Sequence, residues 1–106
     1  MILFEEFQKI ELKVAKVLSA EKVEKSNKLL KLQIDLGGET RQLVAGIAQQ
    51  YTPESIVGRE IIVVANLEPR VVFGIESQGM LLAASSPDGP VLLKPDKEVP
   101  SGCGIR

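Results

Sequence analysis

The residues from Asn66 to Leu82, the run NLEPRVVFGIESQGMLL, combine turn-forming residues with side chains that can bind a ligand. The run combines two amides, a guanidinium group and a hydroxyl with three turn-forming residues, Pro69, Gly74 and Gly79. Such groups recognise a ligand through hydrogen bonds and charge. Because the run separates two apolar stretches, the sequence predicts a binding loop between two buried strands.

The rest of the chain offers little to catalysis. It contains no histidine, and its one cysteine, Cys103, lies near the end in Ser-Gly-Cys-Gly without an obvious activating partner. None of the 14 acidic residues falls in a metal-loop or paired-acid pattern, and no glycine-rich phosphate-binding motif occurs. We therefore expect a protein that is not an enzyme and uses no metal or cofactor.

Composition favours a single soluble domain over residues 1–106. Hydrophobic residues make up 44% and charged residues 25%, as in ordinary globular proteins. The longest apolar run, 61–65, is too short to span a bilayer, and no secretory signal is visible. A lone cysteine fits a reducing compartment. We expect a cytoplasmic protein with no membrane partner.

Hydrophobic periodicity predicts a mostly β chain with two short helices. The first strand shifts its apolar phase by one residue at Lys16, which indicates a β-bulge in a long, bent strand. Gly37-Gly38 is typical of a two-residue hairpin turn, and Thr52-Pro53 of a helix start. The predicted helices are 3–9 and 53–57, and the predicted strands are 10–17, 29–36, 40–47, 60–67, 79–84 and a short edge strand 91–94.

Five main strands with a helix between the third and fourth predict an all-β fold, the five-stranded OB-fold Greek-key barrel. An SH3-like small barrel is the alternative, and the position of the helix favours the OB-fold. OB barrels bind ligands across strands two and three, between the loops joining strands one to two and four to five. The predicted groove has Lys31, Gln33 and Arg41 on its sheet face and is flanked by Lys25, Lys28, Asn66, Arg70 and Ser77.

Charge in this region is locally positive. Residues 9–31 hold seven lysines and three glutamates, a local charge of +4 in a chain whose net charge is -1. Charges screen one another within about 8 Å at physiological salt, so a local patch can attract phosphates, although surface lysines often serve only solubility. Only Tyr51 is expected to be exposed among the aromatic residues, with Phe73 packed. Folded RNA, held through phosphates and 2′-hydroxyls, is therefore favoured over base stacking.

Several spaced motifs support a more specific interpretation. Asn66, Pro69, Gly74, Ser77, Gly79 and Met80 strongly resemble the signature of the tRNA-binding domain appended to methionyl-tRNA synthetases. The stretches KVAKV at 13–17, NKLLKL at 27–32, VAGI at 44–47 and VGR at 57–59 resemble the same family in the same order. The resemblance extends from about Phe7 to the tail.

The resemblance implies an OB-fold that holds tRNA by its shape, without reading the anticodon. It implies a homodimer, with helix 3–9 and the C-terminal extension 85–106 in the interface. The start at Met1 resembles the stand-alone form or a separate subunit, although a segment of a longer enzyme would look the same. A methionyl-tRNA synthetase catalytic chain is the further partner that it implies.

Six site residues come from the resemblance, and Lys31 comes from the groove. Each also has a structural explanation: Met80 could be core, Ser77 could cap a turn, and Asn66 tolerates a left-handed backbone. Relatives often place basic residues after the position of Arg70, where this chain has two valines. The predicted tRNA-binding residues are Lys28, Lys31, Arg41, Asn66, Arg70, Ser77 and Met80.

Three functions remain to be compared. The first is a noncatalytic homodimer that raises the local concentration of tRNA for a synthetase. The second is a chaperone-like homodimeric OB protein of the same superfamily that binds polypeptides; such relatives lack a good match to the segment 77–80. The third is an OB-fold that binds single-stranded nucleic acid, which the scarcity of exposed aromatic residues disfavours.

Overall fold

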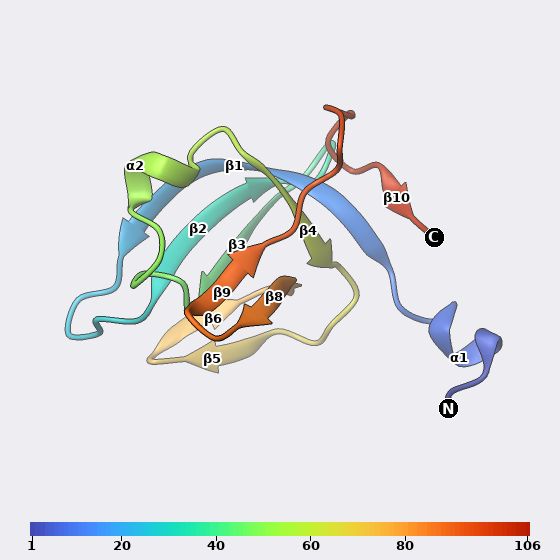
Figure 1. Ribbon diagram of the computed structural model, residues 1–106, viewed down its shortest axis with the longest axis horizontal. Helices are drawn as coiled ribbons and strands as arrows, with labels where there is room; N and C mark the ends of the chain where they lie inside the picture. Colours follow the sequence, from blue (N-terminus) through green and yellow to red (C-terminus); the bar gives the residue numbers. More distant parts are fainter.

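Alternating apolar side chains build a strongly bent sheet, which the computed structural model describes over all of residues 1–106 (Figure 1). The sheet contains β1 (Leu12–Lys22), β2 (Leu30–Asp35), β3 (Thr40–Ala45), β4 (Glu60–Val64) and β7 (Met80–Leu81), in the order β3-β2-β1-β4-β7. Every second residue of β2, namely Leu30, Leu32 and Ile34, is fully buried. These side chains form the barrel core together with residues of β1, β3 and β4.

A β-bulge bends β1, as the sequence predicts. The pairing of β1 with β2 shifts between Val17 and Ser19, two residues beyond the predicted shift at Lys16. Leu18 is the extra residue, and its side chain is exposed. The bend lets one strand serve two neighbours, since its first half pairs with β4 and its second half with β2.

The barrel is closed by side chains as well as by backbone. The backbone N–H of Gln78 donates to the backbone carbonyl of Gln42 at 2.7 Å. The backbone N–H of Gln42 donates to the side-chain oxygen Oε1 of Gln78 at 2.9 Å. The Val44 N–H donates to Ser77 Oγ at 3.0 Å. These bonds join the free edge of β3 to the segment before β7, so the sheet closes almost completely and the predicted OB-fold is confirmed.

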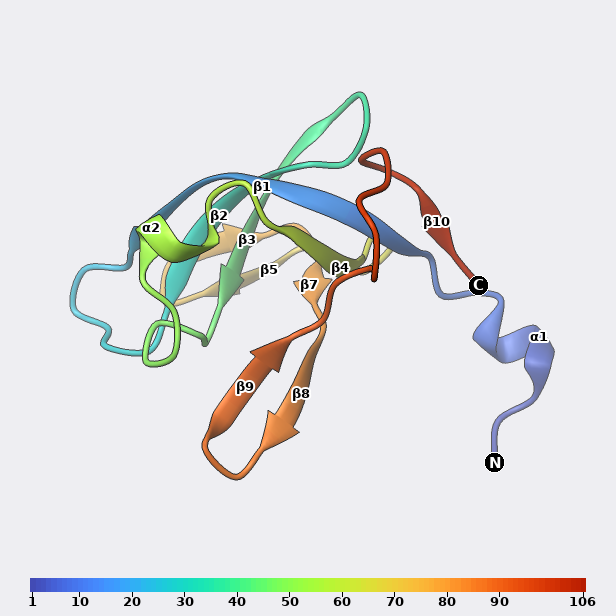
Figure 2. The ribbon, with the colours of Figure 1, turned by 45° about the horizontal axis from the view of Figure 1, so that its top comes forward.

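The predicted helices form, but both are short. The helix α2 (Pro53–Ile56) lies between β3 and β4, is capped by Thr52, and buries Ile56 in the core. The helix α1 (Phe4–Phe7) stands away from the barrel near the C-terminus (Figures 1 and 2). Neither helix is long enough to cross a membrane.

The second half of the chain forms two hairpins. The predicted binding loop folds into β5 (Arg70–Val72) and β6 (Ile75–Ser77), with a two-residue turn at the tip. The predicted fifth strand, 79–84, is divided between β7 and β8 (Ala83–Ser86). The strand β8 pairs with β9 (Gly89–Leu92) in a hairpin that projects from the barrel in Figure 2. The tail then returns to β1 through β10 (Gly104–Ile105).

Candidate nucleic-acid interface

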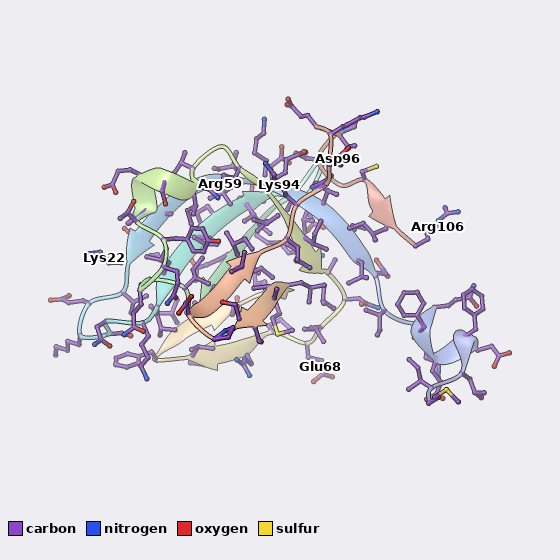
Figure 3. All side chains as sticks on the ribbon, in the orientation of Figure 1. Lys22, Arg59, Glu68, Lys94, Asp96 and Arg106 are labelled. Carbon is purple, nitrogen blue, oxygen red and sulfur yellow. The ribbon has the colours of Figure 1, made fainter.

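Free cations gather at the loop between β1 and β2. Lys22, Lys25 and Lys28 are exposed, and none of them takes part in an ion pair. Figure 3 shows Lys22 at the end of the barrel where this loop lies. Lys31 on β2 is only half exposed and forms a salt bridge with Glu21, the residue opposite it on β1. The loop and the adjoining end of β1 therefore present three ammonium groups that are available to a ligand.

The positive charge predicted over residues 9–31 is divided between different parts of the surface. Lys16 lies away from the β1–β2 loop, in a surface hollow of about 450 Å³ that Arg59 and Lys94 also line. Three carboxylates line the same hollow, and one of them, Glu98, lies 3.8 Å from the Lys16 ammonium. The charges of this hollow balance, so the β1–β2 loop is the stronger anion site.

Arg41 does not share a face with Lys31 and Gln33, contrary to the sequence prediction. It lies opposite Ile34, whereas Gln33 lies opposite Gln42, so Arg41 belongs to the inward-facing set of β3. Its guanidinium group contacts the Glu39 carboxylate at 3.0 Å and donates to the Ala65 carbonyl oxygen. Arg41 therefore braces the end of the barrel and has little capacity left for a phosphate.

Asn66 and Ser77 are also used by the fold. The Asn66 side-chain amide donates to the Lys9 carbonyl at 2.6 Å and accepts from the Glu11 N–H at 2.8 Å. These bonds hold the segment after α1 against the end of β4. The Ser77 side chain is 3% exposed, accepts from Val44 and donates to the Gly79 carbonyl at 3.0 Å. Ser77 therefore positions the loop from the interior and Asn66 from the surface.

Arg70 and Met80 differ from these residues because they face solvent. Arg70 begins β5 opposite Ser77 and has no ion-pair or hydrogen-bond partner. Strand spacings of about 4.8 Å place it roughly 14 Å from Lys31, across β3 and β6. Met80 is 49% exposed and lies opposite Val64 at the end of β7.

The aromatic residues reverse their expected positions. Tyr51 packs against the core, and its hydroxyl accepts from the Leu92 N–H at 3.0 Å, so the expectation that it is exposed is wrong. Phe73, expected to pack, is 59% exposed at the tip of the β5–β6 hairpin. The sequence feature that could have predicted this exposure is Phe73-Gly74, because these residues form the two-residue turn between the paired residues Val72 and Ile75.

Comparison with known proteins identifies the family of the chain. The family profile described as "Putative tRNA binding domain" matches residues 12–103. The methionine--tRNA ligase of Methanothrix thermoacetophila is 58% identical over 106 residues, which are 100% of this chain and 16% of the ligase. The ligase of Thermotoga maritima is 57% identical over 98% of this chain and 16% of the ligase. The chain thus spans about one sixth of the length of these relatives.

Solved structures include two kinds of neighbour. A MetRS related protein from Pyrococcus horikoshii has a TM-score of 0.91 and 43% identity, with 100% of both chains covered. The chaperone CsaA from Bacillus anthracis has a TM-score of 0.90 and 32% identity, covering 100% of this chain and 99% of the other. The same architecture is therefore found in proteins described in two different ways.

Proposed function

This chain belongs to the tRNA-binding domain family, and from that membership we propose that it binds folded tRNA without catalysing a reaction. The observation that carries the proposal is the set of cations without an ion-pair partner around the β1–β2 loop and on β5. Lys22 at the end of β1, Lys25 and Lys28 on the β1–β2 loop, and Arg70 on β5 all lack an ion-pair partner. Such groups suit the phosphates of a large polyanion.

The shape of this surface supports a large, folded ligand. The hollows beside Lys31 have volumes of about 140 and 270 Å³, below the range typical of pockets that enclose small molecules. On the neighbouring sheet face, the Gln33 side chain already donates to the Gln42 side chain at 3.0 Å. A shallow surface with separated cations fits the contour of folded RNA.

We also propose that two copies associate through residues 3–9 and 85–106. Phe4 of α1 is 70% exposed, and a hollow of about 240 Å³ lies between α1 and the end of the chain. A larger apolar groove, of about 560 Å³, lies beside it and is lined by Leu12 and Val14 of β1, Ile62 of β4 and Leu93 of the tail, among others. Continuous apolar surface of this kind marks an interface. A second copy would cover it and would present a second cationic end to the same RNA.

The proposed biological role is to hold tRNA near a methionyl-tRNA synthetase in the cytoplasm. Two relatives that match 98–100% of this chain are methionine--tRNA ligases, of which it spans 16%. A binding domain that is part of such an enzyme, or associates with it, raises the effective concentration of tRNA at the catalytic site.

A polypeptide-binding role is the second candidate, and one observation favours it. The CsaA neighbours are described as chaperones, and the apolar groove offers a surface to unfolded chains. This role requires the groove to stay open, whereas the dimer covers it. The free cations at the other end would then have no function in binding.

The test is a salt titration of binding to folded tRNA, unfolded tRNA and an unstructured oligonucleotide. Each phosphate engaged lowers log K by about 0.7 to 0.9 per unit of log salt, so four cations predict a slope of roughly −3. Arg70→Ala should weaken binding and reduce the slope by about 0.8. Arg59→Ala removes the same charge from the charge-balanced hollow near α2, where Figure 3 labels it, and should change neither value.

Equal affinity for the three ligands would contradict recognition of shape. Tighter binding of an unfolded polypeptide than of tRNA would favour the chaperone-like role. Sedimentation of the free protein measures the proposed dimer separately, so a monomer that binds tRNA would overturn the dimer alone.

A further inference from the structure

Phe73 is exposed and has a left-handed backbone, and neither feature stabilises the folded protein. Its ring is 59% exposed, and its backbone has φ +55°, in the left-handed region that bulky residues rarely adopt. Gly74 follows with φ +79°, so the two residues form a turn with positive φ at both central positions. Asn-Gly is the preferred pair for such a turn. A phenylalanine here gains neither burial nor a favourable backbone.

The opposite loop carries a matching feature. Apart from glycines, the chain has two residues with positive φ, Phe73 and Lys25. Lys25 lies in the β1–β2 loop, which Figures 1 and 2 show at the same end of the barrel as the tip of the β5–β6 hairpin. Strained residues of this kind cluster at binding sites because the surrounding structure holds them in place for a ligand.

The surroundings of the ring indicate the chemistry of its partner. Ile75, next to the turn, lines a hollow of about 270 Å³ with Lys22 and Lys31. Glu21 and Glu24 line it too, and Glu21 is already paired with Lys31. Among the unpaired groups of the loop and the hairpin, the three lysines Lys22, Lys25 and Lys28 outnumber the two glutamates Glu24 and Glu76, so the free charge near the hairpin tip is positive.

A protein partner fits this tip less well. The exposed apolar residues of the hairpin are Val71 and Phe73, a much smaller area than the roughly 800 Å² that each side of a stable protein interface buries. An exposed aromatic residue at the same end of the barrel as free ammonium groups suits a molecule that offers flat, apolar faces between phosphates. RNA has this alternation of base and phosphate.

We propose that the Phe73 ring stacks on a nucleobase of the bound RNA, at the end of a helical stack or on a base turned out of one, while the lysines of the β1–β2 loop contact the neighbouring phosphates. This inference rests on the proposed tRNA binding and adds to it a base contact. The left-handed turn holds the ring outward, which reduces the entropy lost when the base binds.

Phe73→Asn separates stacking from folding. It creates the favoured Asn-Gly turn, so the melting temperature should stay the same or rise. Binding to an unfractionated, folded tRNA preparation should weaken about tenfold, within the range measured for the loss of one stacking aromatic residue. The slope of log K against log salt should not change, because no charge is removed.

Phe73→Trp supplies a second readout in a chain that has no tryptophan. The variant should bind tRNA at least as tightly as the wild type, and its indole emission should be quenched on binding. Val71→Thr, on the same hairpin, is the matched control and should leave the affinity within twofold of the wild type.

The outcomes distinguish the two proposals. A wild-type protein that does not bind tRNA overturns the proposed function and the stacking contact with it. Tight wild-type binding that Phe73→Asn leaves unchanged overturns the stacking contact alone, as does tRNA binding by Phe73→Trp without a change in emission. If Phe73→Asn loses affinity only for unfolded polypeptides, the ring contacts protein and not a base.

Discussion

Replacing Ser77 with alanine should lower stability first and RNA binding only as a consequence. The Ser77 hydroxyl is buried, accepts from the Val44 N–H at 3.0 Å and donates to the Gly79 carbonyl at 3.0 Å. Alanine fits the same space but leaves a donor and an acceptor unpaired. At about 1 kcal/mol for each lost bond, the free energy of unfolding should fall by about 2 kcal/mol. For a domain of this size, the melting temperature should then fall by roughly 10 °C.

Urea denaturation of the Ser77→Ala variant measures the loss directly. Ser85→Ala is the matched control because Ser85 is exposed and its hydroxyl has no partner in the protein, so the change should stay within about 0.5 kcal/mol. Well below its melting temperature, Ser77→Ala should bind tRNA as the wild type does. A variant of unchanged stability that binds tRNA weakly would refute this reasoning, because the hydroxyl would then act on the ligand.

Three further substitutions test the other bracing contacts. Arg41→Ala should lower the free energy of unfolding by about 1 kcal/mol in urea denaturation, since it frees the Ala65 carbonyl; a stable variant with weak tRNA binding would restore Arg41 to the interface. Asn66→Ala should speed hydrogen exchange at the Glu11 amide, whose acceptor it removes, and unchanged protection there would show that the contact is dispensable. Gly79→Ala should destabilise more than Gly38→Ala in thermal melts: both have positive φ, but only at Gly79 would a Cβ lie 2.9 Å from a carbonyl oxygen. Equal losses of melting temperature in the two variants would mean that the backbone around Gly79 shifts to make room for the Cβ.

Features set by local pattern were predictable from the sequence. The alternation along β2 specifies its buried face, and Gly37-Gly38 with φ +78° and +104° forms the predicted turn. Thr52 caps α2 as expected, with the Ser55 N–H donating to its hydroxyl at 3.2 Å. In each case the residues that decide the structure lie within a few positions of one another, so their spacing is sufficient evidence.

Features that depend on distant contacts were not predictable in the same way. Asn66 bonds to Glu11, 55 positions away, and the same residue type also suits an exposed turn or a ligand contact. A charged strand residue such as Arg41 is expected on the outer face of a sheet. Its pairing with Ile34 instead places it on the inward side. Because a shift of one residue exchanges the two faces of a strand, a small error in register moves a candidate from the groove to the core side.

In this loop, the residues that support the fold have hydrogen-bond partners within the protein, and the residues proposed to contact the ligand do not. A hairpin that reaches out from a barrel must be anchored, and amides and hydroxyls anchor it by bonding to backbone groups of neighbouring segments. The Asn66 amide and the Ser77 hydroxyl each donate one hydrogen bond and accept another in this way. Arg70 has no such partner, and Phe73 has neither burial nor a relaxed backbone. The groups that the fold leaves unused are therefore those that a ligand can bind, while the residues that carry the family signature hold them in place.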